Sequence, residues 1–581
     1  MPTNTTSTLN EKNLPWIFSL SVVIGLVSGV VAWLFRLLIG FIHNLAFYGK
    51  FSPFYEANIH SAPSSWGWLI IFVPVLGGII VVWLIKNFAP QAKGHGVPEV
   101  IDAIHYNQGA IPGKVSLIKA LASSLTIGTG GSLGREGPIV QIGAAFSSAL
   151  GQWLKLPARQ RIVLIACGSS GGIAATFNAP LAGLLFSIEL ILVSINSKTI
   201  LPVALSTAIA AYVGRILIGS HPAFDIPNLQ SLTPSLTSVN EFILMVPFGA
   251  IIGFLSIIFV KGIYWSEDKF DAIPVNDYVR HMLGTLALGI LFYSMYRFAG
   301  HYYVQGVGYS AINDILSGAL ANPGFLLLLV ALKLLATCLV IGSGGSGGVF
   351  SPSLFLGAAM GGAIGHLLQA MFPELGIDPV TFAIVGMAAL VAAATSAPLT
   401  AAIITYEMTL DYSIILPLMI AIGVAYAVRR MFMESNIYTL KLLRRGHIVP
   451  EGLASDYVGN LKVDSLVNRN FRIRDVNTTF SAYEGITIGT RDNSIVGIIQ
   501  PYNRPVEYDV SVEDLMDTGF VILRSGMHLI GALRHLHSSH ARFAVISQNA
   551  SPLAEEILGV ISETEIHQIM SKTAELHQGS S

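Results

Sequence analysis

Charged side chains are scarce in this chain of 581 residues, because Asp, Glu, Lys and Arg make up only 12% of it. Soluble globular proteins carry about 25%, so the composition excludes an ordinary soluble enzyme, and a hydrophobic content of 52% excludes a disordered protein. The formal net charge of −1 excludes a global basic surface for nucleic acid. Cysteine is almost absent: Cys167 and Cys338 both lie in apolar runs, which excludes a disulfide framework.

The charged residues that do occur are unevenly distributed. Residues 446–581 contain 26 of them, the density of an ordinary soluble domain, whereas apolar runs dominate the chain before that point. Several runs reach the length of about 20 residues that a membrane-spanning helix needs. Shorter runs broken by glycine and proline are tolerated at membrane depth only where they pack on protein or line a cavity. We therefore expect an all-α polytopic membrane domain with re-entrant broken helices, followed by a soluble domain.

A pattern in the first half of the apolar region recurs in the second half. Ala174–Leu181 is similar to Ala392–Leu399, and in both copies a glutamate, Glu189 or Glu407, stands nine residues after the proline. Matching segments broken by glycine and proline indicate a transport site at the interface between two repeats. Chance similarity between two apolar stretches is the alternative explanation.

Three segments share one design, in which glycines precede a proline and an apolar helix. They are GHGVP at 94–98, GREGP at 134–138 and GVFSP at 348–352. Proline fits the first turn of a helix, and a helix N-terminus carries about half a positive charge together with unpaired N–H donors. Three such starts, if they converge, would bind an anion without a fixed full charge. Taken singly, each segment could equally be a flexible turn between spans.

Together and in this order, the three segments resemble the GxGxP, GxEGP and GxFxP signatures of the CLC family of chloride channels and transporters, and Phe177–Gly183 matches the family as well. The resemblance covers residues 16–446. It implies a glutamate-gated transmembrane chloride channel that forms a homodimer in the lipid bilayer. It also implies two inverted repeats, at 16–232 and 240–446. No nucleophile–base pair or metal motif occurs in the sequence, so we expect neither an enzyme, a required cofactor nor a metal site.

The resemblance also assigns roles to individual residues. Glu136 matches the gating glutamate, whose carboxylate occupies the anion path when ionised and swings out when it is protonated or displaced. A carboxylate at membrane depth is functional by default, although Glu136 could instead only stabilise a helix N-terminus. The residues that would bind the anion belong to the three helix starts and to a late tyrosine: His95, Gly96, Arg135, Gly137, Val349, Phe350 and Tyr438.

Two positions depart from the family pattern. His95 stands where serine is common, and a histidine can become a cation near neutral pH. We expect His95 to change anion preference or pH dependence, unless its ring points away. Leu190 stands where exchangers of the family have a proton-carrying glutamate, so the sequence favours a passive channel, with a proton-coupled chloride/anion antiporter as the alternative. A divalent-cation transporter is a remote alternative, because its site needs clustered oxygen ligands.

The soluble part, 450–575, resembles an α+β tandem CBS domain whose first copy is degenerate and whose second copy spans 512–570. CBS pairs often bind adenine nucleotides, and Ser562 and Glu565 occupy the corresponding places, although a structural dimerisation role is the stronger interpretation. Basic residues flank the last apolar run, and the positive-inside rule then places this end in the cytoplasm. We expect a multi-pass protein of the cell or inner membrane with both termini cytoplasmic, including the tail 1–15.

Overall fold

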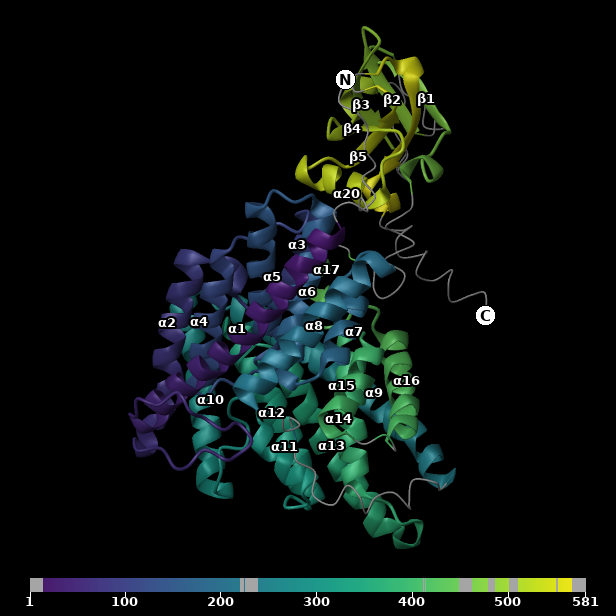
Figure 1. Cartoon of the computed structure of the whole chain (residues 1–581). Helices are drawn as coiled ribbons and strands as arrows, with labels where there is room; N and C mark the ends of the chain where they lie inside the picture. The colour runs from purple at the N-terminus through teal and green to yellow at the C-terminus, as the bar shows by residue number, and fades with distance from the viewer. Residues whose placement is uncertain are drawn as a thin grey trace. The chain divides into compact units, whose positions relative to one another are not determined.

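A computed structural model describes residues 14–219, 224, 239–410, 412, 414–447, 449, 462–478, 486–500, 510–549 and 552–566. The chain divides into two compact units, Met1–His447 and Ile448–Ser581. The first unit is helical, and its helices follow one another through the colour range from purple to green in Figure 1. They are α1 (Leu14–Tyr48), α2 (Val73–Phe88), α3 (Val97–Tyr106), α4 (Lys114–Gly128), α5 (Glu136–Trp153), α6 (Ala158–Phe177), α7 (Pro180–Leu190), α8 (Ser197–Ile218), α9 (Val239–Asp271), α10 (Asp277–Ala299), α11 (Tyr309–Leu316), α12 (Pro323–Ser343), α13 (Phe350–Met371), α14 (Pro379–Thr395), α15 (Pro398–Thr409), α16 (Ile415–Phe432) and α17 (Thr439–Arg444).

Helix length separates membrane-spanning helices from broken ones. Among the described residues, eight helices are long and apolar enough to cross a membrane: α1, α2 with the turn before it, α8, α9, α10, α12, α13 and α16. By contrast, α3, α7, α11 and α15 have 10, 11, 8 and 12 residues, well short of the roughly 20 that a span requires. The unit is therefore a predominantly helical polytopic membrane domain that contains short helices, as the sequence predicts.

Two breaks at matching positions divide long apolar stretches into pairs of helices. Asn178 ends α6 with a φ of 58°, and Ser396 ends α14 with a φ of 59°. A residue in this left-handed region satisfies the last carbonyls of a helix but cannot continue it. In each case an alanine and a proline follow, and the proline opens the next helix, α7 or α15. The local sequence thus explains why the apolar run 162–195 forms two helices.

The helices after these breaks cap one another through two glutamates. Glu189, near the end of α7, accepts hydrogen bonds from the Leu399 and Thr400 N–H groups of α15 at 2.9 and 2.7 Å, and from the Thr400 hydroxyl at 2.6 Å. Glu407 of α15 reciprocally accepts from the first N–H groups of α7, those of Leu181 and Ala182, at 3.0 and 2.8 Å. Each carboxylate compensates N–H donors that a helix start leaves unpaired.

Glycine allows the closest helix contacts in the core. A Cβ atom on Gly143 of α5 would collide with the Gly168 carbonyl of α6, and one on Gly357 of α13 would collide with the Gly386 carbonyl of α14. Small residues at helix interfaces let two backbones approach closely within a membrane. The α5–α6 and α13–α14 pairs are therefore packed in the same way.

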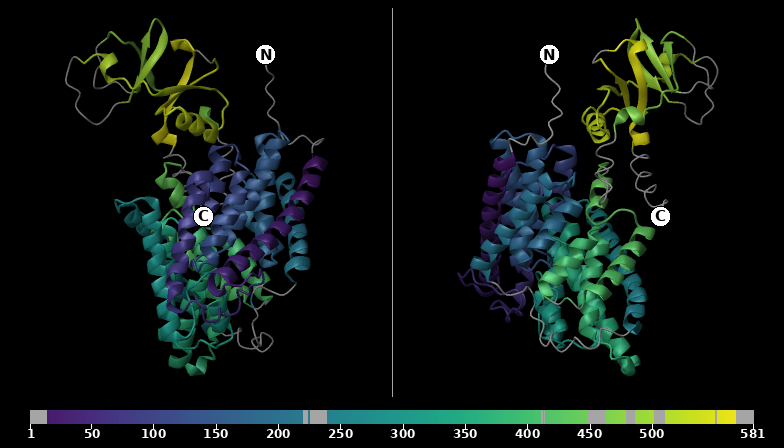
Figure 2. Two further views of the ribbon diagram at one scale, coloured as in Figure 1. Left: turned by 90° about the vertical axis from the view of Figure 1, so that its left-hand side faces the viewer. Right: turned by 45° about the vertical axis from the view of Figure 1, so that its right-hand side comes forward.

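The membrane unit has two distinct ends. Figures 1 and 2 show α17 near the end at which α1 begins, and the segment after Tyr48 at the opposite end. Four ion-paired contacts attach α17 and the residues after it to α3 and α9. The Arg444 guanidinium binds Asp268 at 2.8 Å, Lys441 and Arg445 both bind Glu99, and His447 binds Asp102.

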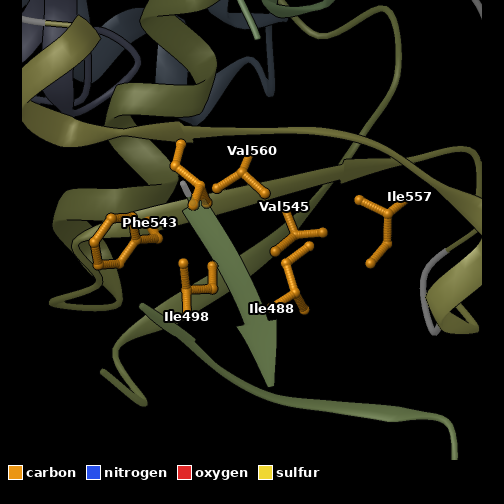
Figure 3. Close-up of a cluster of buried hydrophobic side chains, with 7 residues drawn as sticks. Ile488, Ile498, Phe543, Val545, Ile557 and Val560 are labelled. Carbon is orange, nitrogen blue, oxygen red and sulfur yellow. The ribbon is translucent and has the colours of Figure 1, made fainter. Parts of the chain in front are cut away.

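The second unit contains two small sheets of similar design. The first consists of β1 (Phe471–Asp475), β2 (Ile486–Arg491) and β3 (Ser494–Ile499), and the second of β4 (Phe520–Arg524), β5 (Phe543–Ser547) and β6 (Ile557–Ser562), with the helices α19 (Val512–Leu515) and α20 (Leu529–Ser538). In each sheet the first two strands are parallel and the last two antiparallel. Side chains of both sheets form one buried cluster, which Figure 3 shows around Ile488, Ile498 and Val545.

Candidate functional site

The three glycine-rich segments singled out in the sequence lie together in the structure. Gly94 donates to the Gly345 carbonyl at 3.0 Å and accepts from the Gly347 N–H at 3.2 Å. Gly134 and Gly348 exchange two backbone hydrogen bonds of 2.7 and 2.6 Å. These contacts bring the starts of α3, α5 and α13 to one place, where their N–H groups and positive dipole ends can act on the same anion.

Glu136 is the first residue of α5 and its side chain is only 2% exposed. One carboxylate oxygen, Oε1, accepts hydrogen bonds from the Tyr309 hydroxyl and, at 2.6 Å, from the Ser351 hydroxyl. Tyr309 is the first residue of α11 and Ser351 the second residue of α13. The carboxylate is thus held where three helix starts meet. Its other oxygen, Oε2, is buried and has no hydrogen-bond partner within the part of the chain that the structure describes.

Glu136 and Tyr438 line the same small cavity, although 302 sequence positions separate them. Its volume is about 10 Å³, which is close to the smallest space that holds one water-sized species. The wall is otherwise largely apolar: Val97, Gly137, Val140, Ile173, Phe177, Phe186, Phe350, Thr400 and Ile404 complete the lining. A partly dehydrated anion would therefore find its polar partners mainly at the Tyr438 hydroxyl and at the backbone N–H groups of the helix starts.

The position of Tyr438 is fixed by its neighbours. Its N–H donates to the Asn436 side chain at 2.7 Å, and the Tyr264 hydroxyl of α9 donates to the Ile437 carbonyl at 2.6 Å. Tyr438 is only 2% exposed and directly precedes α17. A tyrosine buried to this extent differs from the residues of an interfacial aromatic belt, which lie at the membrane–water boundary.

Not all the predicted anion-binding residues line this cavity. Gly137 and Phe350 do, while Val349 is the buried residue immediately before α13. Gly96 precedes α3 with a φ of 89°, a conformation that favours glycine. His95 is 2% exposed, lies with its ring centroid 6.4 Å from that of Tyr438, and has a buried Nδ1 without a hydrogen-bond partner among the described residues. It is near the cavity without lining it.

Arg135 and Leu190 also lie outside this cavity. Arg135 lines a different cavity, which its place beside Glu136 in the chain does not predict. Leu190 is the half-buried last residue of α7. Its neighbour Glu189 is connected to the cavity through Thr400. Thr400 lines the cavity wall, and its hydroxyl donates to the Glu189 carboxylate.

Several residues that build the site were not predicted from the sequence. Tyr309 follows Gly306 and Gly308, which repeat the glycine spacing of Gly94 and Gly96, but no proline marks the helix start. Two buried lysines support these corresponding loops. Lys119 donates to the Ala92 and Gly94 carbonyls at 3.0 and 2.6 Å, and Lys333 donates to the Val304 and Gly306 carbonyls at 3.2 and 2.9 Å.

Glu99, in the first turn of α3, is paired with two basic side chains. Lys441 lies 3.1 Å from Glu99 Oε1, and Arg445 forms a two-pronged contact with the same carboxylate. Burial alone raises the pKa of Glu99, but the charges and hydrogen bonds of Lys441 and Arg445 outweigh burial, so that the pKa is lowered. No group of three or more His, Cys, Asp or Glu side chains that could hold a metal ion occurs among the described residues.

The two residues assigned to nucleotide binding bind each other. Glu565 Oε2 accepts hydrogen bonds from the Ser562 N–H at 2.8 Å and from its hydroxyl at 2.9 Å, and the Glu565 N–H donates back to the Ser562 hydroxyl at 3.1 Å. This reciprocal arrangement is that of a helix capping box. It occupies the serine hydroxyl and one oxygen of the carboxylate.

Comparisons with known proteins point to one family. Residues 77–430 match the model of the family described as "Voltage gated chloride channel". The "H(+)/Cl(-) exchange transporter ClcA" of Vibrio parahaemolyticus is 32% identical over 454 residues, which cover 76% of this chain and 93% of that protein.

Solved structures give the same result. The crystal structure of "a slow cyanobacterial Cl-/H+ antiporter" matches with a TM-score of 0.64 and 26% identity, covering 74% of this chain and 97% of that one. A structure described as "a eukaryotic CLC transporter" matches with a TM-score of 0.62 over 95% of this chain and 98% of that one. At 18% identity, this second match bears on the fold alone.

Proposed function

Because this chain belongs to the voltage-gated chloride channel family, we propose that it moves chloride across a membrane in exchange for protons. Family membership and the eight apolar helices support a multi-pass membrane protein for chloride transport. The sequence favoured a passive channel because of Leu190. The relatives named as exchange transporters and antiporters favour exchange instead.

The observation that carries the proposal is the placement of the Glu136 carboxylate where the starts of α5, α11 and α13 meet. A carboxylate in this place has the charge and hydrogen-bonding capacity of the permeating anion, so it competes with chloride for the same donors. When Glu136 is protonated or displaced, its side chain leaves and chloride passes. The residue then moves a proton one way as chloride moves the other way. The backbone of Gly96, Gly137, Val349 and Phe350, together with the Tyr438 hydroxyl, would bind the chloride.

A route for the proton past Leu190 is available through Thr400. The Thr400 hydroxyl donates to Glu189 at 2.6 Å, and Thr400 lines the cavity that also contains Glu136. Hydroxyl groups both donate and accept hydrogen bonds, so Thr400 can relay a proton between Glu189 and the cavity. We infer that Glu189, besides capping α15, takes the proton-carrying role that the neighbouring leucine cannot take.

Passive chloride conduction is the second candidate, and Leu190 is the observation that favours it. The test is proton movement in liposomes that contain the purified full-length protein, driven only by a chloride gradient. Exchange predicts proton uptake against its gradient, and the loss of this uptake in Glu136→Gln. Rapid chloride flux without proton movement would refute exchange and support the channel.

The proton route has its own matched pair of variants. Glu189→Gln and Glu407→Gln each neutralise a carboxylate that caps a helix of the other half, but only Glu189 contacts Thr400. We expect Glu189→Gln to uncouple protons from chloride and Glu407→Gln to leave the coupling unchanged. Equal effects of the two variants would assign Glu189 a structural role only.

We also infer the larger organisation of the protein from the correspondences above. The paired breaks, reciprocal caps and paired lysines support two inverted repeats at 16–232 and 240–446. The two similar sheets support a CBS pair at 450–575, with the first copy shorter. A homodimer, cytoplasmic termini, and adenine nucleotide binding near Ser562 and Glu565 stay predictions. Crosslinking in native membranes tests the dimer, and calorimetry with ATP tests the nucleotide.

A further inference from the structure

A second cavity lies beside the gating residue but is separate from the cavity of Tyr438, with which it shares no lining residue. Its volume is about 20 Å³, enough for a single water-sized species. Arg36 of α1 and Arg135, the residue before α5, are its charged lining residues. The rest of the wall consists of Ile39, His43, Tyr55, Ala57, Ile127, Gly306 and Val307. Two arginines and no carboxylate thus line one small space.

Among the described residues, neither guanidinium forms an ion pair or a side-chain hydrogen bond. The Arg135 Nε is buried and has no hydrogen-bond partner in this part of the chain, and the Arg135 guanidinium lies 5.4 Å from the centre of the Tyr309 ring. The carboxylate of Glu56, an exposed residue beyond ion-pair distance, attracts the Arg36 guanidinium. The positive charge of Arg135 repels it.

Two like charges in so small a space are unfavourable unless an anion lies between them. Both arginines are half-buried, and each offers up to five N–H donors. The buried Arg135 Nε has no partner among the described residues, and a buried polar group of this kind favours a ligand that accepts its hydrogen bond. A space of this size excludes phosphate, sulfate and carboxylate-bearing molecules. We propose that the cavity between Arg36 and Arg135 binds a single halide-sized anion, at a site separate from the transport path.

An anion in this site would act on Glu136 through Arg135 and Tyr309. Arg135 precedes Glu136 in the chain and contacts the ring of Tyr309, whose hydroxyl donates to the Glu136 carboxylate. The bound anion and the ionised carboxylate are both stabilised by the same positive charge, so each weakens the binding of the other. Such coupling is reciprocal. The site therefore makes the release of Glu136 sensitive to the halide concentration, whether the protein is an exchanger or a channel.

Bromide locates the site directly. Crystals of the full-length protein grown with bromide in place of chloride are expected to show an anomalous peak within hydrogen-bond distance of both Arg36 and Arg135. Arg36→Gln is expected to lose this peak while a peak near Tyr438 remains. Absence of the peak in the wild type, or its persistence in Arg36→Gln, would overturn the proposal. The proton-flux test of exchange is unaffected by either result.

Calorimetric titration of bromide into the detergent-solubilised protein supplies the solution measurement. We expect Arg36→Gln to weaken one class of binding by about tenfold or more, the effect of losing a hydrogen bond to a charged group. Arg159→Gln, a change at an exposed arginine of α6, is the control and should leave binding unchanged. In Arg36→Glu the new carboxylate would pair with Arg135 in place of the ion, so this variant should fold and also lack the site. Unchanged binding in Arg36→Glu would refute the inference.

Discussion

Removal of the Tyr309 hydroxyl tests how the gate is held. Tyr309→Phe deletes one of the two hydroxyl groups that donate to Glu136 Oε1 and leaves the ring packed 5.2 Å from Phe224. A hydrogen bond to a charged group contributes about 1.5–3 kcal/mol. At about 1.4 kcal/mol for each factor of ten, the variant should shift the balance between the carboxylate in place and the carboxylate displaced by about 10- to 150-fold.

The direction of the effect follows from competition. The carboxylate and chloride compete for the same donors, so a less tightly held Glu136 gives way at lower chloride concentration. We expect the chloride concentration for half-maximal uptake into liposomes to fall by about tenfold or more in Tyr309→Phe. The remaining donor, the Ser351 hydroxyl at 2.6 Å, limits the effect. The double variant that also carries Ser351→Ala should go further in the same direction.

Two comparisons make this prediction refutable. Tyr303→Phe removes the hydroxyl of a buried tyrosine that packs 5.3 Å from Phe325, and it should leave the chloride dependence unchanged. In a Glu136→Ala background no carboxylate remains to be held, so Tyr309→Phe should have no further effect. An unchanged chloride dependence in Tyr309→Phe, or the same change in both backgrounds, would show that the hydroxyl does not hold the gate.

Three other substitutions test the site and the core. His95→Ser should change the ratio of chloride to nitrate uptake or the pH profile of flux, because the side chain lies near Tyr438; no change in either would dispose of the role of His95. Lys119→Met removes a charged donor from the Ala92 and Gly94 carbonyls, which keep only the Ser346 hydroxyl and the Gly347 N–H, and should cost about 1–3 kcal/mol in stability, measured by thermal unfolding in detergent. Gly357→Ala drives a methyl group into the Gly386 carbonyl and should cost about 1–3 kcal/mol. Gly423→Ala meets no neighbouring atom and should be neutral in the same assay.

Much of the site could be predicted from the sequence, because the residues that mark its helix starts are neighbours in the chain. Glycine and proline mark where helices begin, and the resemblance of these glycine-rich segments to the family signatures pointed to Glu136, Gly137 and Phe350, which the fold brings to one cavity with Tyr438. Low charge and long apolar runs were likewise sufficient to predict a helical membrane domain. A short stretch of sequence determines both where a helix begins and whether the segment prefers lipid to water, so these features can be predicted locally.

The features missed by the sequence depend on side-chain direction between distant segments. Arg135 stands beside Glu136 in the chain, yet the two side chains line different cavities. Tyr309 starts a helix without the proline that marks the other starts, so its approach to Glu136 had no local signal. The sequence favoured a channel where the relatives favour an exchanger, for a related reason. A leucine at position 190 cannot carry a proton there. The sequence does not show, however, that the fold brings other groups near, such as the Thr400 hydroxyl.

The exchanged glutamate caps have a consequence for how the chain is made. The start of α7 is synthesised long before its partner exists, since Leu181 precedes Glu407 by 226 residues. Until Glu407 is synthesised, the N–H groups at the start of α7 have no carboxylate to bind. Likewise, the Glu189 carboxylate has no partner until Leu399 is added 210 residues later. Unpaired polar groups are costly in hydrocarbon. The first half of the protein should therefore remain open to water or to insertion factors during translation, and the two halves should close around each other in one late step.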